Sequence, residues 1–241
     1  MEQLTPEFLA TGFLWFAAFL FSVTVHEAAH AFVAWRLGDP TAYEGGQVTL
    51  NPLPHVQREP VGTILVPVIS YAIGGWMIGW ASAPYDPIWA DRHPKRAAWM
   101  ALAGPVSNLL IVLLTALVIR GGMLFGVLAA PSDTSPGLTG LVQAASSGPW
   151  EAAATLLSVL FALNVLLFAF NLLPLPPLDG SGCLPLVLPE AAARKWNDTL
   201  REPGFSLLGL LVAWKVFGYV FWPVLVLMLN LLYPGMGWHL S

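Results

Sequence analysis

Two histidines and a glutamate, His26, Glu27 and His30, form an H-E-x-x-H motif inside a long apolar stretch of the chain. Histidines at this spacing lie on one face of a helix, which allows both imidazoles to bind the same zinc ion. The Glu27 carboxylate is adjacent in sequence, where it can accept a proton from a water molecule at the metal. The motif therefore predicts a metal site that activates water for hydrolysis.

The stretch that carries this motif, roughly residues 8–37, is long enough to cross a membrane, which takes about 20 apolar residues. Two imidazoles and a carboxylate in lipid are unfavourable by several kcal/mol unless a metal, a partner group or water compensates. The alternative is a chance match, with both histidines merely hydrogen-bonded to neighbours. That alternative is weaker in a membrane helix than it would be in a soluble protein.

A third metal ligand is expected, because catalytic zinc usually takes three protein ligands and keeps one position open. Cys183 is the only cysteine, and His55, His93 and His239 lie in predicted loops or near the end of the chain. Asp179 follows a proline-rich break after an apolar stretch, where unwound backbone could bring its carboxylate to the metal. An Asp-Gly pair is also an ordinary turn, and the local sequence alone leaves both interpretations open.

The composition places the chain among membrane proteins. Of its 241 residues, 56% are hydrophobic and only 10% are charged, whereas soluble domains carry about 25% charged residues. The net charge is −4 and there is no basic stripe, so we expect no nucleic-acid partner. No soluble segment of domain size interrupts the apolar stretches, and we interpret residues 1–241 as a single membrane-embedded domain.

The apolar stretches predict an all-α polytopic membrane protein with four to six membrane helices. These stretches cover roughly residues 8–37, 61–82, 97–120, 152–173 and 205–232. If residues 61–82 re-enter the membrane instead of crossing it, most cationic residues fall in loops on one side, which the positive-inside rule assigns to the cytoplasm. Eight of the ten Lys and Arg residues then lie there: Arg36, Arg58, Arg92, Lys95, Arg96, Arg194, Lys195 and Arg201.

Residues 61–82 decide the topology. Gly74 and Gly75 near the middle of this stretch suit a re-entrant turn, which is tolerated where protein or water satisfies the exposed backbone. This arrangement also brings Asp179 close to the depth of His30, about 10 Å from the cytoplasmic end of the first helix. Five full spans would put these two residues on opposite faces. We therefore predict four spanning helices plus one re-entrant segment, with five full spans as the alternative.

Residues 43–53 are polar, β-branched and glycine-containing, unlike the apolar stretches on either side. This pattern is typical of a short strand or a tight hairpin. We predict a small β-hairpin there, near the active site.

Three motifs, in order along the chain, resemble those of the site-2 protease family of intramembrane zinc metalloproteases. They are the H-E-x-x-H motif, A-G-P-V-S-N at residues 103–108, and N-x-x-P-x-P-x-L-D-G at residues 171–180. Residues 49–55, followed by Gly62 and Thr63, resemble the compact prokaryotic branch, which lacks a PDZ or CBS domain. The resemblance covers roughly residues 22–204, although the loop at 56–61 is longer than is usual in that branch.

The resemblance implies one zinc ion (Zn2+) per chain, bound by His26, His30 and Asp179. It also implies that Glu27 is the general base, which takes a proton from the attacking water and later passes it to the leaving amine. In these terms the chain is a hydrolase, a zinc metalloendopeptidase, and its single domain is a metalloprotease domain.

The same resemblance suggests supporting roles for other residues. Asn108 and Asn171 would bind substrate or shape the site, and Gly104 would permit close helix approach. His55 would be a polar residue near the site, with an ordinary loop histidine as the alternative. The hairpin at 43–53 would pair with an unwound strand of the substrate.

The expected substrate is a transmembrane segment of another protein, cut within or near the lipid bilayer. The expected location is the cell membrane of a prokaryote, with a multi-pass topology and the active site towards the cytoplasm. One alternative is a membrane metal-binding or transport protein, which would need more ionisable residues along a path across the membrane. The other is a catalytically silent, chaperone-like relative, against which the intact Glu27 argues.

Overall fold

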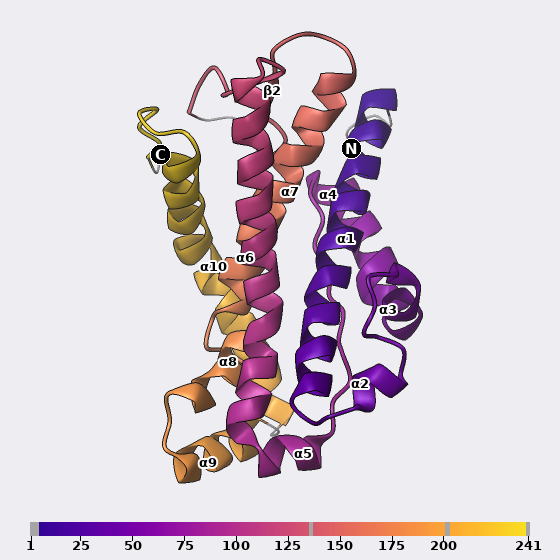
Figure 1. The fold of residues 1–241 in the computed structure, drawn as a ribbon, viewed down its shortest axis with the longest axis vertical. Coiled ribbons are helices and arrows are strands. Elements are labelled where there is room, and N and C mark those ends of the chain that lie inside the picture. Colours follow the sequence, from indigo (N-terminus) through magenta and orange to yellow (C-terminus); the bar gives the residue numbers. More distant parts are fainter. Residues whose placement is uncertain (1–4, 135–136, 201–202, 240–241) are drawn as a thin grey trace.

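The computed structural model describes residues 5–134, 137–200 and 203–239. Within these ranges, four helices are long and apolar enough to cross a membrane: α1 (Pro6–Arg36), α6 (Pro94–Leu124), α7 (Pro149–Asn171) and α10 (Pro203–Leu232). They run side by side along the long axis of the molecule, with α6 packed against α1 and α7, and α10 against α7 (Figure 1). The prediction of an all-α polytopic membrane protein is confirmed.

Each long helix begins at a proline, which lacks a backbone N–H and fits the first turn because that N–H would have no helical partner. The hydroxyl of Thr5 accepts a hydrogen bond from the Phe8 backbone N–H and caps the start of α1. Gly38 follows the end of α1 with a φ of +105°, a conformation that favours glycine. The limits of the first span thus follow from its local sequence.

The second apolar stretch forms a short re-entrant unit. A π-helical segment, η1 (Val61–Leu65), continues into α4 (Val66–Gly74), and together they are shorter than a membrane span. The helix ends at Gly75, whose φ of +72° lies in the left-handed region. The chain then turns back, and the backbone N–H of Trp80 donates to the carbonyl oxygen of Gly62 (3.1 Å). Within the described residues, four helices are therefore long enough to span, and the second apolar stretch forms a shorter unit that turns back, which agrees with four spanning helices plus one re-entrant segment better than with five full spans.

An extended segment, residues 77–86, leads from the re-entrant unit to α5 (Pro87–Arg92), at the end of the molecule where α1 ends (Figure 1). Asp39, just beyond α1, accepts a hydrogen bond from the backbone N–H of Asp86 (2.8 Å). Further back along the segment, the hydroxyl of Ser82 donates to the Glu59 carboxylate (2.8 Å). Carboxylates from two different loops therefore hold this segment in place.

The predicted hairpin at residues 43–53 is wrong in position. This region instead contains the end of α2 (Thr41–Glu44), an irregular turn and the start of α3 (Pro52–Arg58). Helix-capping chemistry outweighs the strand-like pattern: Asn51 accepts the backbone N–H of Leu53 (3.0 Å), and proline at position 52 cannot donate to a strand partner.

A small antiparallel sheet does exist, but elsewhere in the chain. It pairs β1 (Leu128–Ala129) with β2 (Gln143–Ala144), with Leu128 opposite Ala144. It lies at the end of the molecule where α6 ends and α7 begins, opposite to α5 (Figure 1).

Two clusters of buried apolar side chains hold the helices of the bundle together. Trp15 and Phe19 of α1, Tyr71 of α4, and Val159 and Leu163 of α7 form one buried apolar cluster. A second cluster joins α6, α7 and α10. Since lipid is as apolar as these side chains, close packing rather than removal from water stabilises both clusters. After α7, the short helices α8 (Asp179–Cys183), η2 (Leu184–Leu186) and α9 (Glu190–Leu200) complete the end of the molecule that carries α5 (Figure 1).

Candidate metal centre

The H-E-x-x-H residues lie in the last third of α1 and are buried. The relative exposures of His26, Glu27 and His30 are 6%, 5% and 7%. One helical turn separates the two histidines, and their Nε2 atoms are 3.0 Å apart. Each of the three residues offers one nitrogen or oxygen atom that could bind a metal, and these three atoms all lie within 4.8 Å of one another.

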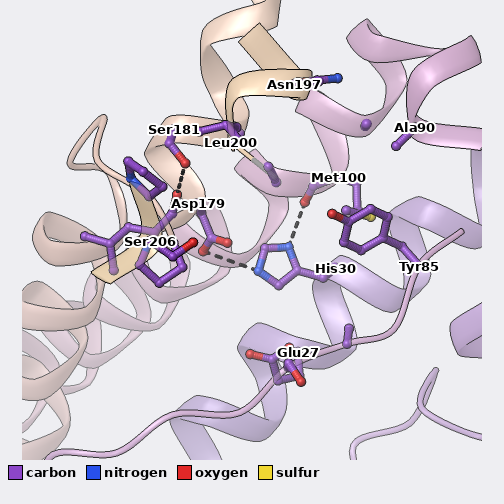
Figure 2. A pocket seen from close by; sticks show the side chains of 18 of the residues that line it. Glu27, His30, Tyr85, Ala90, Met100, Asp179, Ser181, Asn197, Leu200 and Ser206 are labelled. Atoms are coloured by element: carbon purple, nitrogen blue, oxygen red, sulfur yellow. Dashed lines mark hydrogen bonds and ion pairs between the residues drawn. The ribbon is translucent and has the colours of Figure 1, made fainter. Parts of the chain in front are cut away.

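Asp179 joins this group from a distant part of the chain. Its Oδ2 atom is 3.0 Å from Nε2 of His26 and 3.3 Å from Nε2 of His30. The proline-containing segment after α7 turns the chain back, and α8 begins at Asp179 itself and packs against α6. Gly180 permits this fold, because a side chain there would collide with the backbone of Leu172 and Leu173. Figure 2 shows Asp179 and Glu27 on different sides of the His30 imidazole.

The Nε2 atoms of His26 and His30 and Oδ2 of Asp179 meet at one point, called the convergence point below. The Nδ1 atom of each imidazole, on the other side of the ring, carries a proton. Nδ1 of His30 is 2.8 Å from the carbonyl oxygen of Met100, which can only accept, so Nδ1 carries the proton. Nδ1 of His26 is 2.6 Å from Oδ1 of Asn108, which likewise accepts. When each ring is neutral, its Nε2 atom therefore presents a lone pair towards the other imidazole and Asp179.

In this protonation state three acceptor atoms converge, an arrangement that suits a cation. Two imidazole nitrogens and one carboxylate oxygen are a donor set that zinc accepts in catalytic sites, and the hydrogen bonds at Nδ1 orient both rings for it. Burial raises the pKa of the Asp179 carboxyl, but the neighbouring His30 and His26 outweigh burial and hold that pKa well below its usual range. The residues present thus fit a zinc ion.

Gly104 of α6 lies directly against the histidines. A Cβ atom at this position would collide with Nε2 of both His26 and His30. The close approach of α6 to α1 that was expected for this glycine is therefore seen at the metal-binding face itself.

Replacing Gly104 with alanine is expected to weaken zinc binding more than tenfold, as an order-of-magnitude estimate, because the added methyl displaces rings whose orientation the site requires. Equilibrium competition with a chromophoric chelator measures this. The matched control is Gly121→Ala on the same helix, where a Cβ atom meets nothing within 4 Å. Equal zinc affinity of the two variants would show that the contact has no role.

A cavity of about 410 Å³ opens beside the convergence point. Glu27, His30 and Asp179 line one side, and residues 81–83 and Tyr85 of the extended segment line another. In Figure 2 the Tyr85 ring and Asp179 are seen on opposite sides of the His30 imidazole. Within the described part of the chain, residues 81–85 form no hydrogen bond to other backbone groups. The backbone of this cavity-lining segment is therefore not part of any described helix or sheet.

The remaining residues expected at the site lie in different places. Asn108 is fully buried against His26, so it contacts a candidate ligand rather than the cavity. Asn171 is the last residue of α7, half-buried, and does not line the cavity. His55 is buried in α3, with Nε2 donating to the Thr49 carbonyl oxygen (3.1 Å), and it does not line the cavity either.

Sequence reasoning missed Asn164 in the middle of α7. Its side chain is fully buried and contacts Asn108 (2.9 Å) and Ser22 of α1 (2.9 Å). An amide in the centre of an apolar stretch is itself a signal, because such groups are unfavourable in lipid without a partner. That signal was present in the sequence and could have placed α7 against the site.

The fold and the site together define a multi-pass membrane protein with a buried centre suited to zinc. Over residues 14–213 the chain matches Peptidase family M50, and it belongs to that family. The resemblance to site-2 proteases is thereby confirmed, and the chain is a zinc metalloprotease by family.

Curated relatives agree. The chain is 36% identical over 207 residues to "Putative zinc metalloprotease YwhC" of Bacillus subtilis, covering 85% of this chain and 82% of that protein. It is 31% identical to "Putative zinc metalloprotease Rip2" of Mycolicibacterium smegmatis, and the match covers 75% of this chain and 62% of that protein. Rip2 of Mycobacterium tuberculosis Erdman is also 31% identical, over 86% of this chain and 71% of that protein. No solved structure matches the chain.

Proposed function

We propose that this protein is an intramembrane endopeptidase that cuts transmembrane segments of other membrane proteins. The observation that carries the proposal is the depth of the site: the two candidate histidine ligands lie within α1, about 9 Å (His30) and about 15 Å (His26) from its end, where a membrane-embedded chain would have direct access. One zinc ion per chain would be bound by His26, His30 and Asp179.

The zinc ion, when bound, would polarise the scissile carbonyl and make water acidic enough to be deprotonated near neutral pH. Glu27 would take that proton, since its carboxylate borders both the ligand group and the cavity. It would then deliver the proton to the amine that leaves. A single carboxylate in this position serves both steps without any further acid in the cavity.

The substrate must lose its helical structure before it is cut, because a helix keeps its carbonyl groups in internal hydrogen bonds. The backbone groups of residues 81–85 would pair with the unwound segment as an added strand, beside Glu27. Carboxylate contacts at Ser82 and Asp86 keep this edge in position.

The site would face the cytoplasm of a prokaryotic cell. Arg36 ends α1, and Arg92, Lys95, Arg194 and Lys195 lie in or next to α5 and α9, at the same end of the molecule (Figure 1). Clusters of this sign mark the cytoplasmic side of a membrane protein.

The test is cleavage of a reporter protein with a single transmembrane segment, co-reconstituted with the zinc-loaded protein in liposomes. We expect cuts within or next to the segment, mapped by mass spectrometry, and faster cleavage when Gly or Pro weakens the substrate helix. Cuts confined to soluble loops would overturn the intramembrane specificity. Zinc binding with no cleavage of any segment would favour the catalytically silent relative, and zinc flux across the liposome membrane would favour a transporter.

A further inference from the structure

A chain of buried side chains leads from His26 across α6 to α7 and back to α1. Oδ1 of Asn108 contacts Nδ1 of His26 (2.6 Å), and Nδ2 of Asn108 donates to Oδ1 of Asn164 (2.9 Å). Nδ2 of Asn164 donates to the Leu160 carbonyl oxygen (2.8 Å) and to the Ser22 hydroxyl (2.9 Å). Asn108, Asn164 and Ser22 are all at 0% exposure, so water does not compete for these bonds.

The direction of every bond in this chain follows from one fixed acceptor. The Leu160 carbonyl oxygen can only accept, so the Asn164 amide must turn its NH2 group towards it. Oδ1 of Asn164 then faces Asn108, which must present its own NH2 group. This leaves Oδ1 of Asn108 for His26, and Nδ1 of His26 must be the protonated nitrogen.

We infer that Asn164 is a positioning residue for metal binding: together with Asn108 it forms an amide relay that fixes the tautomer of His26. The relay keeps Nε2 of His26 unprotonated and directed towards Asp179 and His30. A flipped Asn108 amide would present NH2 to Nδ1, force the proton onto Nε2 and block that atom as a ligand. His30 needs no relay, because the Met100 carbonyl oxygen fixes its tautomer directly.

The inference rests on the proposed zinc site and adds a residue with no contact to the metal, the water or the substrate. Outer partners of ligating histidines typically change metal affinity by about 10–100-fold when removed. We expect a loss of that size for Asn164→Leu, because leucine keeps the bulk of the side chain but leaves the Asn108 amide free to flip.

The test measures zinc affinity of the full-length protein in detergent by chelator competition, together with the d–d absorption spectrum of the Co2+-substituted form. Asn230→Leu is the matched control: Asn230 of α10 bonds to Val226 and Trp238, far along the chain from the ligands. We expect Asn230→Leu to bind zinc as the wild type does, with an unchanged cobalt spectrum.

The decisive variant is the double substitution Asn108→Asp with Asn164→Leu. Both oxygens of a carboxylate at position 108 accept, so it fixes the tautomer of His26 without any help from position 164. We therefore expect the double variant to regain the zinc affinity that Asn164→Leu alone has lost. If Asn164→Leu acted only through a packing defect, Asn108→Asp would not restore the affinity, because the leucine is still present.

Each outcome is informative. Zinc affinity of Asn164→Leu equal to that of the wild type would overturn the relay, as would a double variant as weak as Asn164→Leu. A wild-type protein that binds no zinc would instead overturn the proposed function itself, and the two failures are distinguishable in the same titration.

Discussion

Substitution of Glu27 by glutamine will leave a protein that binds zinc but scarcely cleaves. The glutamine amide has nearly the same shape as the carboxylate but cannot accept a proton from water. General-base groups typically contribute about 10²–10⁴-fold to the rate, and we expect kcat of reporter cleavage to fall by about that factor. Glu27 is buried beside the histidines and its side chain forms no hydrogen bond with them, so the geometry of the candidate ligands should persist.

Two measurements on one preparation separate these effects. Zinc content by atomic absorption should match the wild type, while single-turnover cleavage of the reporter segment should be slow. Cleavage at the wild-type rate by Glu27→Gln would remove Glu27 as the base. A loss of zinc together with activity would instead make Glu27 part of the ligand set.

Asp179→Asn is expected to weaken zinc binding more severely than any other single change described here. It replaces the one anionic group among the three proposed ligands, whose Oδ2 lies within 3.3 Å of both imidazoles, with a neutral amide. The loss should exceed the roughly 10–100-fold effect that is typical of outer partners, and activity should disappear with it. Chelator competition on the purified protein measures the change.

Glu190→Gln provides a control with the same change in net charge. Glu190 is an exposed residue of α9 whose carboxylate pairs with Arg194 (2.8 Å), and a surface pair of this kind contributes little. It should therefore retain zinc affinity. If Asp179→Asn bound zinc as tightly as Glu190→Gln does, a different third ligand would have to be sought, and His55 would be the first residue to test.

The parts of the fold that the sequence predicts well depend on residue spacing, helix-start residues and the distribution of charge along the chain. Helical spacing puts His26 and His30 on one face, proline marks the helix starts, and the distribution of Lys and Arg indicates that residues 61–82 re-enter. Asp179 was a reasonable candidate because a proline-broken helix end frees the backbone. Its distance to the imidazoles, however, depends on packing between α6 and α8, which only coordinates give.

The features that the sequence does not predict arise where two local signals compete, or where residues far apart in the sequence come into contact. Residues 43–53 have a strand-like composition, but the cap at Asn51 and the proline after it favour a helix. The extended segment 77–86 has no strand partner, so no pairing pattern reveals it, and side chains of Asp39 and Glu59 hold it instead. The hydrogen bond between Asn108 and Asn164 joins two helices, and the spacing of the two residues in the sequence does not predict that they meet.

The candidate ligands enter the membrane at very different times during synthesis. The histidines are in α1, whereas Asp179 follows His26 by 153 positions, after α7. A growing chain therefore carries an incomplete set of candidate ligands until these 153 further positions have been made. A protease of the kind proposed above would therefore stay inactive until the segment that carries Asp179 has folded against α1 and α6.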